Sequence, residues 1–269
     1  MPSRLGQNFL VDRHWQARVA GAVAARPGER ILEIGGGRGD LTALLARSGA
    51  QIHVVELDSH WADHLRLRFQ DVPRVTVQQA DILRMDLNAF HAAPGESAWR
   101  VFGNLPYYIT SPILLHLFPH AAHLQDAVLM VQQEVGERLC APPGQRAFGI
   151  LTVTTQLYAR CSRLFDLPPG AFRPAPKVTS TLLRLEFAPR AATLEIEPDA
   201  FIGFLRCAFA QKRKRLSNNL TVWAPSPAVS AHLVALGYAA SARAEQLTLE
   251  ALATLYHRLR GSAETRSAV

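Results

Sequence analysis

The chain has few of the residues that characterise disulfide-rich or zinc-binding proteins. Its 269 residues include three cysteines, Cys140, Cys161 and Cys207. Because their number is odd and they lie far apart, we expect small buried side chains here rather than disulfides or zinc knuckles. His60 and His64 have the spacing of a metal-ligand pair, but no third ligand stands at a motif spacing. The sequence therefore predicts no metal site.

Long apolar runs are absent as well. No stretch approaches the ~20 apolar residues that cross a membrane, and the N-terminus has no apolar segment typical of a signal peptide. We therefore expect a cytoplasmic protein with no membrane partner. Acidic residues are the scarcer charge, because 22 Asp and Glu stand against 29 Lys and Arg. The formal net charge of +7 favours a polyanionic partner.

Positive charge is concentrated in one segment of ten residues that contains no acid. Its cations are Arg206, Lys212, Arg213, Lys214 and Arg215. Apolar residues over 201–209 recur at helical spacing, so we expect the cations on the C-terminal part of an amphipathic helix. Such a segment is either a solvated face or a phosphate-binding one, and we favour phosphate contact.

A glycine-rich turn separates the first predicted strand from a predicted helix. Residues 30–34 form a short apolar run, Gly35 to Gly39 favour a tight loop, and residues 40–46 have a helical pattern. This arrangement presents backbone N–H groups and a helix N-terminus to a ligand, which suits a nucleotide cofactor. A nicotinamide dehydrogenase would have glycine at position 40, where Asp40 stands, so this alternative is weakened.

Polar side chains follow three further predicted strands. Glu56 ends one apolar run, where its carboxylate can accept both ribose hydroxyls of an adenosine. Asp81 and Asn104 follow two others. In an open parallel sheet, ligands bind across the carboxyl ends of the strands. We therefore expect Gly35, Glu56, Asp81 and Asn104 to line one crevice.

The Asn-Leu-Pro-Tyr sequence at positions 104–107 suits methylation of an amino group on a base. An exocyclic adenine amine is a poor nucleophile because its lone pair is delocalised into the ring. We expect the Asn104 carbonyl and the backbone carbonyl of Pro106 to accept hydrogen bonds from that amine. Tyr107 offers a face on which the base can stack. The alternative is a strand that ends at proline beside a half-buried tyrosine.

The pattern of strands ends near residue 190. Strand-like runs recur at 128–131, 151–158 and 178–185, and the last two suggest an antiparallel pair that closes a parallel sheet. Beyond residue 190 the pattern is helical, with predicted helices starting at Pro198, Ser226 and Thr248.

Length and composition allow one or two domains, and this change of pattern favours two. We expect a larger α/β domain over residues 1–189 and a smaller all-helical domain over residues 190–269.

Eight segments distributed along the chain carry a family resemblance. They are LGQNFL (5–10), EIGGGRG (33–39), ELD (56–58), QAD (79–81), FGNLPY (102–107), FRPAPKV (172–178), AFAQKRK (208–214) and RAE (243–245). With these segments the chain resembles the S-adenosylmethionine-dependent ribosomal RNA adenine N6-dimethyltransferases. It is most similar to their bacterial small-subunit branch, the KsgA/RsmA type. The resemblance implies a Rossmann-like methyltransferase domain followed by a smaller helical domain that binds RNA.

The resemblance also implies roles in holding the cofactor, S-adenosylmethionine. By this resemblance Asn8 and Leu10 help to hold it, Gly35 lies against its amino-acid end, Glu56 binds its ribose and Asp81 contacts its adenine.

For the target adenine, the resemblance gives Asn104 a place in both the cofactor pocket and catalysis, within the catalytic turn Asn104, Leu105, Pro106 and Tyr107. Phe172 would stack on the flipped adenine opposite the tyrosine.

Two positions depart from the family pattern. Gly36 stands where the family usually has Pro, and Tyr108 where it usually has Asn. We expect Gly36 merely to loosen the loop and the bulky Tyr108 to alter how the adenine seats.

By resemblance, the expected reaction is dimethylation of two adjacent adenosines in the 3′-terminal hairpin loop of 16S rRNA, within a small-subunit assembly intermediate. Direct methyl transfer requires neither a metal nor a covalent nucleophile, and the base must be flipped out of its stack. We expect a monomer. One alternative is the 23S rRNA branch that confers macrolide resistance, which typically has Ile where Leu105 stands. Another is a ribosome-assembly factor that uses the fold as a binding module.

Overall fold

The computed structural model describes residues 7–92 and 96–267. Leu5 and Gly6, which begin the first segment of the family resemblance, lie outside the described residues. The chain divides into two compact units. One comprises Met1–Gly136 and Ala159–Ala188, and the other comprises Glu137–Tyr158 and Pro189–Val269. No helix within the described ranges is long and apolar enough to cross a membrane.

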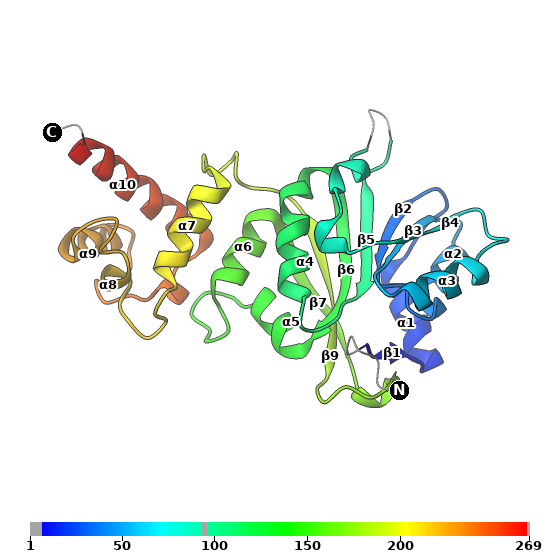
Figure 1. Cartoon of the computed structure of the whole chain (residues 1–269). Coiled ribbons are helices and arrows are strands. Elements are labelled where there is room, and N and C mark those ends of the chain that lie inside the picture. Colours follow the sequence, from blue (N-terminus) through cyan, green and yellow to red (C-terminus); the bar gives the residue numbers. More distant parts are fainter. Residues whose placement is uncertain (1–6, 93–95, 268–269) are drawn as a thin grey trace. The chain divides into compact units, whose positions relative to one another are not determined.

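The described residues of the first unit form a seven-stranded sheet with the order β4-β3-β2-β5-β6-β9-β7 (Figure 1). Its strands are β2 (Arg30–Ile34), β3 (Gln51–Glu56), β4 (Val75–Gln79), β5 (Trp99–Asn104), β6 (Leu124–Gln132), β7 (Ala159–Leu167) and β9 (Ser180–Phe187). The five strands from β4 to β6 are parallel, and β9 pairs antiparallel with both β6 and β7. The predicted parallel sheet is confirmed, and an antiparallel pair lies at one edge as expected, although one of its two strands is not the predicted one.

The first unit also contains helices that pack against this sheet. They include α1 (Arg13–Val23), α2 (Asp40–Ala46), α3 (Ser59–Arg68) and α4 (Thr110–Leu117), with short 3-10 turns η1 (Ile82–Arg84), η2 (Leu87–Phe90), η3 (Phe118–His123) and η4 (Pro169–Ala171). Ile52 and Val54, two residues apart on β3, point into one core cluster with Leu41 and Leu45 of α2 and Val19 of α1. Alternate strand residues therefore anchor the helices.

A separate pair of short strands joins two distant segments of the chain. β1 (Phe9–Leu10) pairs antiparallel with β8 (Phe172–Arg173), and Leu10 lies opposite Phe172. After β1, Asp12 begins α1 by accepting hydrogen bonds from the backbone N–H groups of His14 and Trp15. The N-terminal segment is thereby fixed on both sides.

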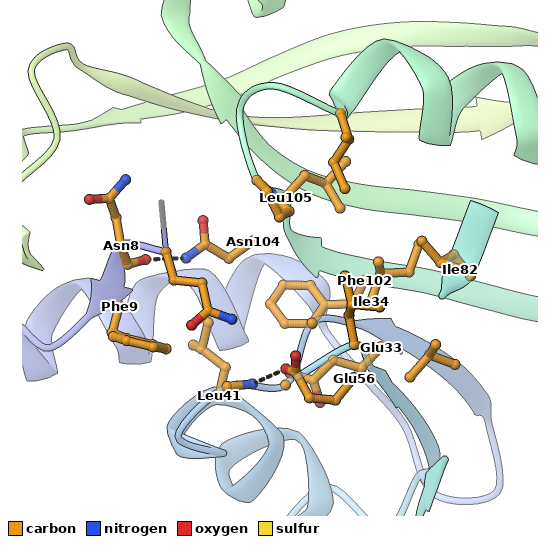
Figure 2. A pocket seen from close by; sticks show the side chains of 18 of the residues that line it. Asn8, Phe9, Glu33, Ile34, Leu41, Glu56, Ile82, Phe102, Asn104 and Leu105 are labelled. Atoms are coloured by element: carbon orange, nitrogen blue, oxygen red, sulfur yellow. Dashed lines mark hydrogen bonds between the residues drawn. The ribbon is translucent and has the colours of Figure 1, made fainter. Parts of the chain in front are cut away.

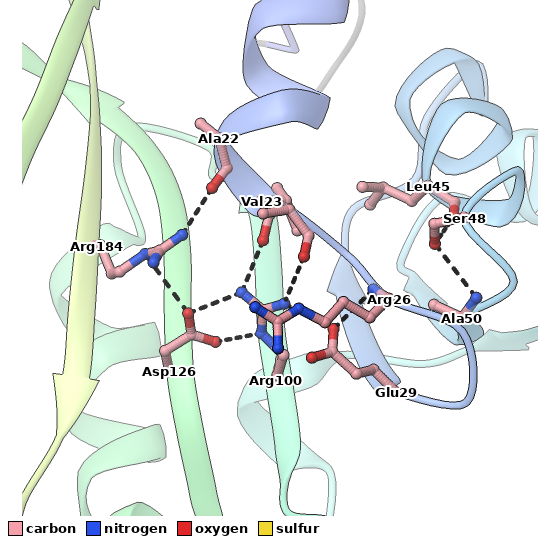
Figure 3. Close-up of polar contacts among 11 residues, drawn as sticks. Ala22, Val23, Arg26, Glu29, Leu45, Ser48, Ala50, Arg100, Asp126 and Arg184 are labelled. Carbon is pink, nitrogen blue, oxygen red and sulfur yellow. Dashed lines mark hydrogen bonds and ion pairs between the residues drawn. The ribbon is translucent and has the colours of Figure 1, made fainter.

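Charged groups are buried below the amino ends of β5 and β6 (Figure 3). Arg100 donates to both carboxylate oxygens of Asp126 at 2.6 and 2.9 Å and to Glu29 at 2.8 Å. It also donates to the carbonyl of Val23 in α1 at 2.7 Å. Arg184 of β9 donates to the carbonyl of Ala22 at 2.7 Å and lies 3.5 Å from Asp126. This network fastens the end of α1 to three strands.

One predicted strand is wrong. Residues 151–158 lie in helix α6 (Ile150–Tyr158), and the strand that pairs with β9 is the next segment, β7. The β-branched threonines that suggest a strand donate their hydroxyls to backbone carbonyls in this helix and in α5 (Gln133–Leu139). Thr155 donates its hydroxyl to the carbonyl of Leu151 at 2.7 Å, and Thr152 donates to the carbonyl of Arg138 at 2.5 Å. Tertiary packing overrides intrinsic strand preference here.

The second unit is helical. Besides α6 it contains α7 (Pro198–Ala208), α8 (Leu216–Asn219), α9 (Ser226–Ala235), η5 (Ala244–Gln246) and α10 (Leu249–Ser267), while α5 (Gln133–Leu139) crosses from the first unit into it. The predicted helix starts at 198, 226 and 248 are confirmed to within one residue. Phe201, Phe204 and Tyr256 form its aromatic core, with ring centroids 5.5 to 6.0 Å apart. The proposed split of function between residues 1–189 and 190–269 remains a prediction.

The basic segment does not lie on the helix that its pattern predicts. α7 ends at Ala208, so Arg206 is helical while Lys212 to Arg215 follow in a turn. The Asn219 side chain donates to the carbonyls of Ala208 and Gln211, at 2.8 and 3.2 Å. These hydrogen bonds satisfy one carbonyl at the helix end and one beyond it, and they stabilise the turn.

Candidate active site

A cavity of about 1090 Å³, including its open mouth, lies at the carboxyl ends of the parallel strands. Gly35, Glu56, Asp81 and Asn104 all line it, so the predicted crevice is confirmed. The strand order reverses between β2 and β5, and such a point is where open sheets bind ligands. Among residues 7–92 and 96–267, no three His, Cys, Asp or Glu are placed to hold a metal ion.

The glycine-rich turn after β2 has a conformation that requires glycine. Gly35 and Gly37 have φ of 76° and 49°, values that residues other than glycine rarely adopt. At Gly36 the constraint is steric rather than conformational. A Cβ there would lie 2.5 Å from Val54 Cγ1 and 2.9 Å from Leu65 Cδ1. The expectation that Gly36 merely loosens the loop is therefore wrong, because it lets the turn approach β3 and α3.

Glu56 is oriented by the backbone around it (Figure 2). Its side chain is buried, and its Oε2 accepts a hydrogen bond from the N–H of Gly37 at 2.9 Å. Its Oε1 accepts one from the N–H of Asp58 at 3.0 Å. Each carboxylate oxygen has two lone-pair directions, so each retains one for a ligand. Two neighbouring ribose hydroxyls fit this arrangement.

Glu33 also lines the cavity, and the sequence reasoning missed it as a site residue. It is buried, and no described residue forms a hydrogen bond with its Oε2. Burial raises the pKa of Glu33 to about 7, with Thr42 opposing this shift and the charge of Glu56 adding to it. The available signal was its place two residues before the glycine turn. Perturbed carboxyl groups in a cavity are typical of functional sites.

Asn104 is held by the N-terminal segment. Its Nδ2 donates to the backbone carbonyl of Asn8 at 2.8 Å, as Figure 2 shows. This contact assigns the nitrogen of the amide to the protein, so Oδ1 is the atom available as an acceptor. Asn8 and Leu10 both line the cavity, as expected of residues that hold a cofactor.

The backbone carbonyl of Pro106 is already occupied. It accepts hydrogen bonds from the N–H of Ile109 at 3.1 Å and from the Thr110 hydroxyl at 3.4 Å. A carbonyl oxygen has two lone pairs, so this geometry contradicts a role for Pro106 in accepting from the amine. The described residues place no donor on the carbonyl of Leu105, which also lines the cavity.

Tyr107 is positioned by a residue that the sequence reasoning missed. Its hydroxyl lies 2.5 Å from Oγ of Ser180, a fully buried residue at the start of β9. Burial raises the pKa of Tyr107, with the Ser180 contact opposing that rise. The sequence signal for Ser180 was its place two residues after the FRPAPKV segment.

Phe172 does not line the cavity. It is fully buried in the core with Leu10, Met130 and Leu182. In this structure its ring has no surface for a base, and stacking would require the ring to leave the core. Its stacking role remains a prediction.

None of the five cations singled out as RNA-binding lines the cavity, and all belong to the second unit. Arg206 and Lys212 to Arg215 are exposed. Lys212 Nζ donates to the carbonyl of Phe148 at 3.1 Å, so part of its charge is satisfied within the unit.

Together these features define a class of protein. The sheet is parallel with an antiparallel pair at one edge, a glycine turn follows β2, and an acidic residue ends β3. These are the features of a Rossmann-like S-adenosylmethionine-dependent methyltransferase. A model of the family "Ribosomal RNA adenine dimethylase" matches residues 2–260. The chain belongs to this family, which confirms the resemblance and makes it a ribosomal RNA adenine dimethyltransferase rather than a nicotinamide dehydrogenase.

Relatives agree with this assignment over almost their whole length. The ribosomal RNA small subunit methyltransferase A of Acidobacterium capsulatum is 48% identical over 95% of this chain and 90% of its own. The protein of that name from Koribacter versatilis is 40% identical over 96% and 94%.

Solved structures confirm the fold. A dimethyladenosine transferase from Plasmodium falciparum has a TM-score of 0.78 at 21% identity, covering 95% of this chain and 98% of that one. The 23S rRNA methyltransferase ErmE has a TM-score of 0.71 at 27% identity, covering 94% and 100%.

Proposed function

We propose that this enzyme dimethylates N6 of two adjacent adenosines in the 3′-terminal hairpin loop of 16S rRNA. The observation that carries the choice of target is the 48% and 40% identity to two proteins named for the small ribosomal subunit. The substrate is 16S rRNA in a small-subunit assembly intermediate, which the enzyme meets in the cytoplasm as a monomer.

The cavity suits S-adenosylmethionine, which carries a sulfonium and an ammonium. The carboxylate of Glu56 gives its floor negative potential, and Glu33, whose Oε2 has no partner among the described residues, adds to it when ionised. In the proposed placement, Glu56 accepts the ribose hydroxyls, Asp81 contacts the adenine, and Gly35 lies against the amino-acid end. Asn8, which precedes β1, and Leu10 of β1 close this pocket.

The methyl donor supplies an electrophilic carbon, and the protein supplies alignment. The target adenine stacks on Tyr107, and Asn104 Oδ1 accepts a hydrogen bond from its amine. We assign the second acceptor to the carbonyl of Leu105, because that of Pro106 is occupied by the turn. As the N6–C bond forms, the S–C bond breaks, and the amine then loses a proton to solvent. A second cycle adds the second methyl group.

RNA outside the cavity binds to the basic segment, Arg206 and Lys212 to Arg215. Replacing the last four by Gln should weaken RNA binding and flatten the plot of log affinity against log salt by roughly 0.7 to 0.9 per lost phosphate contact. Cofactor affinity, measured in parallel, should not change. An unaltered salt slope would assign the segment to a solvated face.

Mass spectrometry of rRNA from cells with and without the gene tests the target. We expect two neighbouring dimethyladenosines of 16S rRNA to disappear with the gene and to return when purified enzyme and S-adenosylmethionine are added to small-subunit particles. Loss of a dimethyladenosine from 23S rRNA instead would establish the macrolide-resistance alternative. Normal subunit maturation with a catalytically dead variant would show that the protein also acts as an assembly factor.

A further inference from the structure

Tyr108 is a large aromatic residue at the mouth of the cavity. It lines the cavity, yet 61% of it is exposed. The ring of its neighbour Tyr107 is turned toward β9 by the contact with Ser180. Adjacent tyrosines thus have opposite surroundings, one half-buried and one in solvent.

The backbone beneath Tyr108 is fixed. The hydrogen bond from Ile109 N–H to the Pro106 carbonyl closes a tight turn around Tyr107 and Tyr108, and α4 begins two residues later. No described aromatic ring or cation packs on the Tyr108 ring. The turn therefore presents an open aromatic face at a defined place on the rim, with little conformational freedom to lose on binding.

Base flipping leaves a neighbouring base that can stack on such an aromatic face. When the target adenine leaves its stack, the base next to it in the strand loses a stacking neighbour. Stacking on an aromatic side chain replaces that contact for any base, because every base has a π-face. The rim also carries Arg38, whose side chain is 49% exposed and lies 3.6 Å from the carboxylate of Asp40. A guanidinium has five N–H donors, so Arg38 can also donate to a phosphate nearby.

We propose that Tyr108 is a stacking platform for the base adjacent to the flipped adenine. The proposal rests on the proposed function, because it needs an RNA substrate whose target base enters the cavity. It assigns this position, where the family usually has Asn, to substrate binding. The ring adds a second base subsite beside the one at Tyr107.

Steady-state kinetics on unmethylated small-subunit particles tests the subsite with Tyr108→Ala, Tyr108→Asn and Tyr108→Phe. We expect the first two to raise KM for the particles roughly 5- to 150-fold, the value of one base stack, and to leave kcat unchanged. Tyr108→Phe keeps the ring and should restore the wild-type KM. Leu67→Ala, which removes an equally exposed apolar side chain on α3 outside the cavity, is the matched control.

Calorimetry with S-adenosylmethionine separates the possible failures. Unchanged cofactor affinity in Tyr108→Ala shows that the variant is folded and that its defect concerns RNA. A loss of cofactor affinity with an unchanged KM for particles would place Tyr108 in the cofactor pocket and overturn the proposal. A wild-type KM in Tyr108→Ala would overturn it too. Wild-type enzyme that leaves the particles unmethylated would refute the proposed function itself.

Discussion

The two ends of the seven-stranded sheet treat buried charge in opposite ways. At the amino ends, the carboxylate of Asp126 faces Arg100 and Arg184, and Arg100 also reaches Glu29. At the carboxyl ends, Glu33 and the carboxylate of Glu56 are both buried, and the described residues place no cation in an ion pair with either.

The difference separates stability from binding within one sheet. A buried carboxylate with cationic partners holds elements together, whereas one without them costs free energy in the empty protein. Such a cost is retained where a ligand compensates for it. The carboxyl end of the sheet therefore has the chemistry of a site for a cationic ligand.

The largest effect is expected from disrupting the ion-pair network at the amino ends of the strands. Arg100→Met should reduce the free energy of unfolding by about 3–5 kcal/mol, because Asp126 and Glu29 would lose their buried cation. Hydrogen exchange of β5 and β6 amides measures this loss. Arg66→Met, which removes an exposed ion pair with Asp63, is the control and should cost at most about 1 kcal/mol. Equal losses in the two variants would refute the structural role of the network.

Asn104→Ala removes an acceptor at the carboxyl end and should lower the methyl-transfer rate by about 10²- to 10³-fold. The variant should lose the group that orients the amine but no contact with the RNA backbone, so its affinity for small-subunit particles should be retained. Single-turnover assays with saturating S-adenosylmethionine separate binding from transfer. Asn88→Ala, on the surface of η2, is the control. Near wild-type transfer by the Asn104 variant would rule out the proposed chemistry.

Glu33 predicts a pH dependence of stability in the cofactor-free enzyme. Its folded pKa of about 7 lies above the ordinary value of 4.5 for a glutamate side chain, so the folded state binds more protons between these values. Stability therefore falls as pH rises through this range, by up to roughly 3 kcal/mol for this group. Glu33→Gln should remove that fall, gaining stability over wild type between pH 5 and pH 8 in urea unfolding.

Glu186→Gln, which changes an exposed carboxylate on β9, is the control for Glu33. Parallel pH profiles for wild type and Glu33→Gln would show that Glu33 stays ionised in the folded protein. In that case the contrast between the two sheet ends would be smaller than the burial of Glu33 indicates.

The smallest effect concerns Ser180. Ser180→Ala should lower kcat/KM for RNA by about 2- to 10-fold, since the lost hydrogen bond to Tyr107 is worth about 0.5–1.5 kcal/mol. Tyr107→Phe breaks the same contact from the other side. If the contact positions the ring, the double variant should lose little more than either single one. Additive losses would mean that the two residues act independently.

Most of the first unit could be predicted because its signals are local. Short strand-like runs between polar turns indicate β2, β3, β4 and β5, and the carboxyl ends of the last three identify Glu56, Asp81 and Asn104. The second unit could be predicted less completely. Residues 137–158 group with its helices although they precede the expected boundary, because their packing partners come from later in the chain.

The sequence by itself determined the parallel sheet, the glycine turn and the crevice. The carboxyl ends of parallel strands meet at one edge of a sheet, so locating the strands was enough to locate the crevice. Tertiary structure decided the rest. Only packing made residues 151–158 a helix, buried Phe172 and required Gly36 beside Val54. Only the folded turn showed that the Pro106 carbonyl is occupied. These outcomes depend on atoms contributed by remote segments or by the closed turn itself, which local pattern cannot register.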